Sequence, residues 1–96
     1  MEASVDAERV ANISIIGELD IASVNAVKLD IDRLLGDHPH RVVFDLGKLS
    51  FMDSSGIALM VQVANSADSV EIHNCTAIVR RVIEIVGLAE TLGLAP

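Results

Sequence analysis

The sequence predicts an α/β domain in which a central mixed β-sheet of about four strands has helices packed against it. Segments with the alternating pattern of strands are followed by segments with the three-and-four spacing of helices, in the order strand, strand, helix, strand, helix, strand, helix. One strand, at residues 41–46, lacks the alternation of a strand exposed on one face, which is typical of the interior of a parallel or mixed sheet. The 96 residues predict a single domain, 1–96.

The first half of the chain contains two expected strands and one helix. Residues 10–16 alternate apolar and polar side chains, which predicts a half-buried strand, and the weaker stretch 3–7 is expected to pair beside it as an edge strand. Across residues 22–35 the apolar side chains recur at the spacing of a helix with one buried stripe. Gly36 and Pro39 are expected to end this helix.

The second half begins with the strand at 41–46, which we expect to be covered on both faces. The following helix, predicted at 57–64, is apolar almost all round and should be well buried. Residues 70–73 alternate apolar and polar side chains, which predicts a shorter, more peripheral strand. Residues 77–86 have the pattern of a helix with one solvent-exposed side. The stretch 89–94 is predicted to be a short final helix.

The composition argues against several classes of partner. Seven basic residues against fourteen acidic ones give a formal net charge of −7, which would repel nucleic-acid phosphates and anionic lipid surfaces. The chain has no Trp or Tyr, so it lacks the aromatic platforms on which single-stranded nucleic acids stack. A protein partner with a basic surface is expected instead.

The termini and the cysteine content predict a soluble, cytoplasmic protein. No apolar run approaches the roughly 18 residues that a membrane-spanning helix needs, and the first residues lack the basic and apolar regions of a signal peptide. The lone Cys75 cannot form an internal disulfide. We expect it to be a small buried apolar residue, with a redox-sensing thiol as the alternative.

The stretch Leu-Ser-Phe-Met-Asp-Ser-Ser-Gly-Ile at 49–57 is the most informative part of the sequence. Asp53 and Ser54 stand just before an apolar run, where short oxygen side chains can cap the free N–H groups of a helix. The alternative to simple capping is that a serine presents an exposed hydroxyl on a rigid turn. Gly56 is expected to let the backbone turn tightly and leave its neighbours uncovered.

A second acidic loop is expected to lie beside this stretch. Asp20 follows the first full strand, and the turn at 53–56 follows the strand at 41–46. Ligands and partners of α/β sheets tend to meet the loops beyond the carboxyl ends of the strands. Both loops can therefore share one end of the sheet, which favours a functional role beyond capping.

Three segments, in this order, carry the pattern of a known family. They are Gly-Glu-Leu-Asp at 17–20, Phe-Met-Asp-Ser-Ser-Gly at 51–56, and Val-Arg-Arg-Val-Ile-Glu at 79–84 followed by Gly87 and Leu88. The sequence thus resembles a STAS domain, the family shared by bacterial anti-sigma factor antagonists and the cytosolic tails of sulfate transporters. The middle segment is the specific one, and the resemblance is especially close to stand-alone bacterial antagonists.

The resemblance implies a partner-switching module. In that family the unphosphorylated antagonist binds an anti-sigma factor, which is also a serine kinase of the histidine-kinase-like ATPase fold, and a sigma factor is released. The kinase then phosphorylates the second serine of the motif, here Ser55, and a serine phosphatase resets the switch. The implied partner-binding residues are Asp20, Asp53, Ser54, Ser55 and Gly56.

The same residues also suggest two rival functions. One is a non-phosphorylated STAS adaptor in a stress-signalling or lipid-transport complex. The other is a hydrolase with Ser55, Asp53 and a histidine as its triad, but the chain has no Gly-x-Ser-x-Gly elbow and no histidine placed by a motif. Enzymatic activity is therefore not expected. A phosphate-binding loop is missing as well, because one glycine lies in the turn and no lysine follows, so no cofactor is expected.

The histidines are the remaining candidates for a site. His38 and His40, together with Asp37, provide too few ligands at fixed spacing to predict a metal site, and His73 at a strand end is interpreted as structural. The oligomeric state is expected to be a monomer or a weak dimer, in which the edge strand or exposed apolar parts of the helices make the contact.

Overall fold

The computed structural model describes residues 1–36 and 39–94, in which it has six strands and three helices. In chain order these are β1 (Glu2–Val5), β2 (Val10–Ser14), β3 (Gly17–Leu19), α1 (Val24–Leu35), β4 (Arg41–Asp45), β5 (Leu49–Met52), α2 (Ser54–Ser66), β6 (Ser69–His73) and α3 (Ala77–Ile85). The predicted alternation of strands and helices is confirmed. Two short strands, β3 and β5, are additions that the sequence pattern did not predict.

The main sheet has four strands in the order β1-β2-β4-β6. β1 runs antiparallel to β2, whereas β2, β4 and β6 are mutually parallel. The sheet is therefore mixed, β1 is the predicted edge strand, and β4 lies in the interior. The register aligns Ile13, Phe44 and Ile72 across the three parallel strands, and these side chains are at most 3% exposed. They form the centre of the core.

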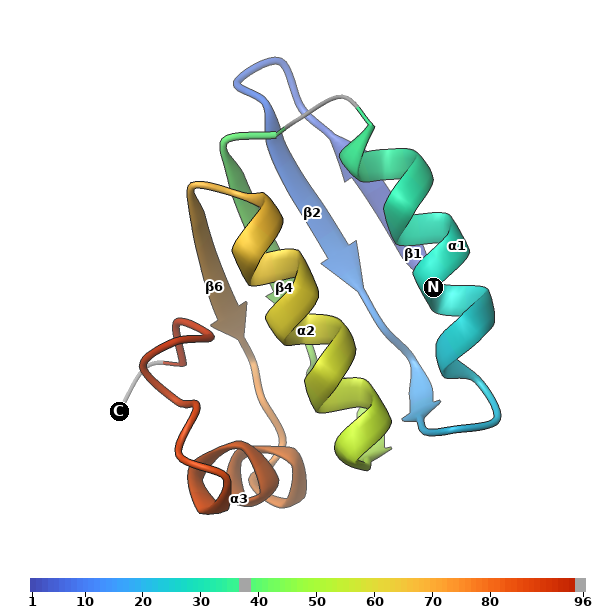
Figure 1. The fold of residues 1–96 in the computed structure, drawn as a ribbon, viewed down its shortest axis with the longest axis vertical. Helices are drawn as coiled ribbons and strands as arrows, with labels where there is room; N and C mark the ends of the chain where they lie inside the picture. The colour runs from blue at the N-terminus through green and yellow to red at the C-terminus, as the bar shows by residue number, and fades with distance from the viewer. Residues whose placement is uncertain (37–38, 95–96) are drawn as a thin grey trace.

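Helices α1 and α2 lie side by side on one face of this sheet (Figure 1). Ile31 of α1 and Met60 of α2 are fully buried, as expected for helices that each turn an apolar stripe toward a sheet. Both helices begin beyond the carboxyl ends of the parallel strands and run back along them. α3 lies at that same end of the sheet, where it contacts β5.

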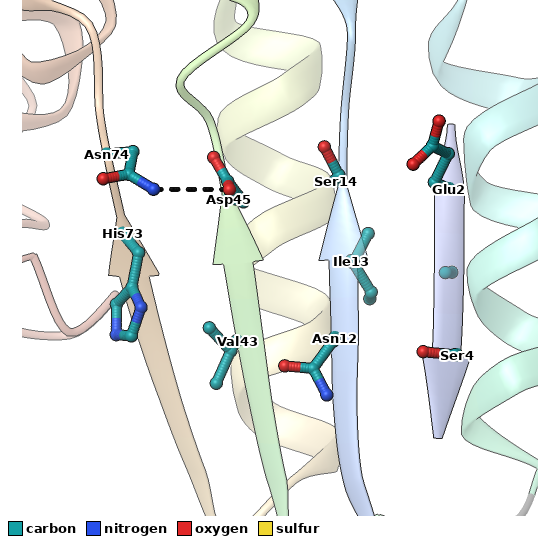
Figure 2. Close-up of a pocket in the computed structure, with 10 residues that line it drawn as sticks. Glu2, Ser4, Asn12, Ile13, Ser14, Val43, Asp45, His73 and Asn74 are labelled. Atoms are coloured by element: carbon teal, nitrogen blue, oxygen red, sulfur yellow. Dashed lines mark hydrogen bonds between the residues drawn. The ribbon is translucent and has the colours of Figure 1, made fainter. Parts of the chain in front are cut away.

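The prediction that the strand at 41–46 is covered on both faces is wrong. Along β4, Val42 and Phe44 are buried, but Arg41 is exposed and Val43 and Asp45 are only half-buried. The face turned away from α1 and α2 is polar, and Figure 2 shows its side chains. Three successive apolar residues suggested two-sided cover, yet the strand follows the alternation of a sheet with one solvated face.

This open face contains a hollow of about 430 Å³ in which side chains of all four main strands take part (Figure 2). Its polar groups are already partly engaged with one another. Asp45 accepts hydrogen bonds from the Asn74 side-chain amide at 3.3 Å and from the Gly47 backbone N–H at 3.0 Å. Further along the same face, Arg41 is paired with Glu71. The hollow lies on the side of the sheet opposite to α1 and α2.

β3 and β5 form a separate parallel pair that extends the fold beyond the main sheet. Leu19 aligns with Met52, and both side chains are almost fully buried. The Ser50 hydroxyl adds a hydrogen bond to the Gly17 carbonyl at 2.9 Å. This small pair fixes where the chain leaves toward α1 and α2, and so it positions the two loops that follow.

The predicted short helix at 89–94 is wrong. The segment forms successive turns and ends in a parallel bridge between Leu94 and Ile72, with the Ile72 N–H donating to the Gly93 carbonyl at 3.1 Å. Gly93 has φ +65°, in the left-handed region that a helix does not use. Leu92 and Leu94 are buried against the core. The segment is thus a strap along β6.

Gly93→Ala should lower the free energy of unfolding substantially. The left-handed backbone costs a non-glycine residue about 1–2 kcal/mol, and an added Cβ would also overlap the Val70 carbonyl oxygen. Gly87→Ala is the matched control, because Gly87 has φ +75° but no atom near the position of an added Cβ. Urea unfolding of both variants measures the difference. Equal losses would contradict the close packing of the strap on β6.

Candidate functional site

The loops after β3 and β5 meet at one end of the molecule. The parallel pairing of Leu19 with Met52 brings the two strand ends together, and the Asp53 N–H donates to the Leu19 carbonyl at 3.2 Å. Asp20 and Asp53 therefore begin neighbouring loops, each of which leads into a helix. This confirms that the two predicted loops share one end of the sheet.

Asp53 is the N-cap of α2 and also ties the two loops together. Its Oδ1 accepts hydrogen bonds from the N–H of Ser55 at 2.8 Å and of Gly56 at 3.4 Å, while Oδ2 accepts from the Ile21 N–H at 3.2 Å. The carboxylate lies at the helix N-terminus, where the helix dipole favours a negative charge. The predicted capping role is confirmed, with an additional bond across 32 residues of chain.

Ser54 and Ser55 are the first two residues of α2, because the helix begins three positions before the predicted residue 57. Ser54 is exposed and Ser55 is half-buried. Within the described part of the chain, neither hydroxyl has a hydrogen-bond partner. The predicted capping role of Ser54 is therefore wrong, because Asp53 alone provides the side-chain cap. Both hydroxyls are left available to an outside group.

The tight-turn role predicted for Gly56 is also wrong. Gly56 lies inside α2 and is buried. A Cβ at this position would lie 2.6 Å from Met52 Cγ and 3.0 Å from two atoms of Leu19. The residue is a glycine because the first turn of α2 packs closely on β5 and β3. At the predicted site, Gly56 allows the first turn of α2 to pack against Met52 and Leu19.

Asp20 organises its own loop. Its Oδ1 accepts hydrogen bonds from the Ser23 hydroxyl at 3.1 Å and from the N–H groups of Ser23 and Ala22 at 3.0 and 3.1 Å. The Ser23 hydroxyl, foremost among these donors, lowers the pKa of the Asp20 carboxyl below its usual value. An aspartate is already ionised at neutral pH, and these donors stabilise its charged form. Asp20 and Asp53 add two negative charges to the surface around Ser55.

Sequence reasoning missed Ile21 as part of this site. Its side chain is 75% exposed, although its N–H is bonded to Asp53. The sequence signal that could have identified it is a large apolar residue in the loop directly after Asp20, before the helix and its apolar stripe begin. An apolar residue in a loop is common, so only the bond to Asp53 shows that it belongs with the two acidic loops.

The other candidate residues lie elsewhere. His40 Nδ1 is 3.2 Å from Asp68 Oδ2, and His73 Nε2 is 3.8 Å from Glu71 Oε2. No group of three or more His, Cys, Asp or Glu side chains within residues 1–36 and 39–94 is arranged to hold a metal ion. Asp37 and His38 lie outside the described residues.

Cys75 is half-buried rather than buried as predicted. Burial raises the pKa of its thiol, which disfavours the reactive thiolate. Among the residues that the structure describes, no helix is both long and apolar enough to cross a membrane.

Replacement of Asp53 should separate its two roles. Asp53→Ala removes both the cap and the bridge to Ile21, and we expect a loss of about 1–2 kcal/mol in the free energy of unfolding. Asp53→Asn keeps a capping oxygen but offers an amide N–H to Ile21, so its loss should be smaller. Urea unfolding measures both, with Ser54→Ala as the control that stays within about 0.5 kcal/mol of wild type. A loss for Ser54→Ala equal to that for Asp53→Ala would refute the assignment of the cap.

Known proteins share both the sequence pattern and the fold. The STAS domain family matches residues 4–96. The chain is 28% identical over 92 residues to the anti-sigma-F factor antagonist RsfB of Mycobacterium tuberculosis, which covers 93% of this chain and 75% of that protein.

Solved structures agree with this match. The crystal structure of an anti-sigma factor antagonist from Mycobacterium paratuberculosis has a TM-score of 0.86 at 25% identity, covering 99% of this chain and 85% of that one. The unphosphorylated anti-sigma factor antagonist SpoIIAA has a TM-score of 0.78 at 23% identity, covering 93% and 82% of the two chains. With its sequence matched almost from end to end and its fold shared, the chain belongs to the STAS domain family.

Proposed function

We propose that this chain is an anti-sigma factor antagonist that acts by partner switching. In this proposal the unphosphorylated form binds an anti-sigma factor, itself a serine kinase of the histidine-kinase-like ATPase fold, and a sigma factor is released. Phosphorylation of Ser55 ends the binding, and a serine phosphatase restores it. The observation that carries the proposal is a serine hydroxyl without a partner in the described chain, at the start of α2 between two acidic loops.

The chemistry at Ser55 suits an acceptor rather than a catalyst. A serine hydroxyl is a weak nucleophile without a neighbouring base. The nearby Asp53 carboxylate is engaged by three backbone N–H groups. The kinase would accordingly supply the base, the magnesium ion and ATP. In our proposal the chain itself catalyses no reaction and needs no cofactor, and residues 1–96 act as one cytoplasmic unit, either a monomer or a weak dimer.

The charge of the site explains how one phosphate would act on binding. A phosphoserine carries about −1.5 to −2 charges at neutral pH. At Ser55 this charge would stand beside the Asp53 carboxylate, and near the loop of Asp20, on a chain whose net charge is already −7. A partner surface fitted to the unphosphorylated site would have to accept the added charge. A 100-fold loss of affinity requires only about 2.7 kcal/mol.

The decisive experiment is a set of pull-downs from the native cytosol, followed by phosphosite mapping of the recovered wild-type bait. The baits are wild type, Ser55→Ala and Ser55→Glu, with Ser54→Glu as the matched control. Ser54 is the adjacent, exposed serine of the same helix turn. We expect wild type and Ser55→Ala to recover the same ATPase-fold protein, Ser54→Glu to recover a reduced amount of it, Ser55→Glu to lose it, and phosphate to map to Ser55.

Two other results would argue against this function. If all four baits recover the same partner and Ser55 carries no phosphate, the chain is a non-phosphorylated adaptor. If Ser54→Glu loses the partner as fully as Ser55→Glu does, the effect is one of general negative charge and not of the second serine of the motif.

Phosphorylation should change binding far more than folding. The free end of a helix tolerates an anion because its dipole and N–H groups favour negative charge. The thermal midpoint of the protein phosphorylated by its kinase should therefore lie close to that of the unmodified protein. A large fall in the midpoint would mean that the phosphate acts by disrupting the Asp53 cap, which would contradict this part of the proposal.

A further inference from the structure

Ile21 is the most exposed of the large apolar side chains in residues 1–36 and 39–94, at 75%. Exposed apolar residues that stand singly are normal on protein surfaces and need no explanation. Ile21 differs because of where it stands and how firmly its backbone is held. It follows Asp20 directly and belongs to the loop that meets the start of α2.

The backbone around Ile21 is fixed on both sides. Its own N–H donates to Asp53 Oδ2 at 3.2 Å, and the next two N–H groups donate to Asp20 Oδ1. The Ser23 hydroxyl oxygen also accepts a hydrogen bond from the Asp20 N–H at 3.0 Å, which closes the loop. A side chain presented on such a turn loses little further backbone freedom when a partner covers it.

The same carboxylate connects Ile21 to the proposed phosphorylation site. Asp53 accepts from the N–H of Ile21 through Oδ2 and from the N–H of Ser55 through Oδ1. The two residues therefore stand on opposite sides of one carboxyl group. Because one carboxyl group joins the two backbones, a single partner surface of ordinary size would be large enough to cover both residues.

We propose that Ile21 is the apolar anchor by which this chain binds its anti-sigma factor, in an apolar pocket of that protein bordered by basic side chains. This inference rests on the proposed function. Interfaces usually concentrate their binding energy in a few buried anchors, most often Trp, Tyr or Arg. This chain has no Trp or Tyr, and neither of the two loops, 20–23 and 53–56, contains an arginine, so an aliphatic side chain takes that place. Asp20 and Asp53 flank it with negative charge, which the basic border would match.

The charge also distinguishes this partner from a second copy of the chain. In a symmetric dimer built on the same surface, each Asp20 and Asp53 would face the corresponding acids of the other subunit. Like charges brought together in this way repel one another, and two chains that each have a net charge of −7 repel each other as well. An anionic lipid surface is disfavoured for the same reason.

The test compares Ile21→Ser with Ile85→Ser. Ile85 lies at the end of α3 and is 73% exposed, so both changes remove the same amount of exposed apolar surface. Calorimetry would measure the affinity of each variant for the purified anti-sigma factor, with wild type and Ser55→Glu alongside. We expect Ile21→Ser to bind at least tenfold more weakly than Ile85→Ser, which corresponds to about 1.4 kcal/mol. Both variants should keep the thermal midpoint of wild type.

Three outcomes would overturn the inference, and they are distinguishable. If wild type binds, Ser55→Glu does not, and Ile21→Ser binds within tenfold of Ile85→Ser, the proposed function stands and the anchor is elsewhere. If wild type itself fails to bind any anti-sigma factor, the proposed function is refuted, and so is the role of Ile21 as its anchor. If Ile21→Ser only converts a dimer to a monomer in sedimentation experiments, the occupant of this surface is a second copy.

Discussion

One carboxylate, that of Asp53, supports the arrangement at the functional end of this domain. It satisfies two of the free N–H groups at the start of α2 and a third in the loop that leads to α1. The bond to Ile21 spans 32 residues of chain, and it joins the first β-α connection to the second. Without it, the one hydrogen bond that joins the two loops among residues 1–36 and 39–94 would be that from the Asp53 N–H to the Leu19 carbonyl. The geometry around Ser55 depends on this single side chain.

The buried packing beneath the loops makes that geometry rigid. Gly56 allows α2 to approach Met52 and Leu19 so closely that a methyl group would not fit. The short parallel pair β3–β5 then holds both strand ends at fixed positions. The switch that we propose at Ser55 would benefit from this rigid packing, because an added charge would change the surface while the underlying structure stays in place.

Most of the architecture could be predicted from periodicity, since α1, α2, α3 and three of the four strands of the main sheet are long enough to repeat a pattern. β3 and β5 could not, because these strands of three and four residues pair only with each other, across distant parts of the chain. β1, also four residues long, was expected only because it lies next in sequence to the clear strand at 10–16. The role of Gly56 was missed for a related reason, since the crowding comes from side chains on two other elements. The candidate site residues were proposed from their positions after strands and before a helix, together with the family resemblance, whereas Ile21 became a candidate only through its bond to Asp53.

The strap formed by the last described residues has a consequence for the behaviour of the sheet. Strands at the edge of a sheet offer unpaired N–H and C=O groups on which another chain can add, and this is a common start of aggregation. On β6 the N–H of Ile72 is already bonded to Gly93, and Leu94 continues as its neighbour. The strap therefore covers part of that edge and hinders the addition of another strand there. Proteolytic removal of these residues would expose the edge of β6 and the apolar core surface that Leu92 and Leu94 now cover. The shortened protein should therefore tend to self-associate.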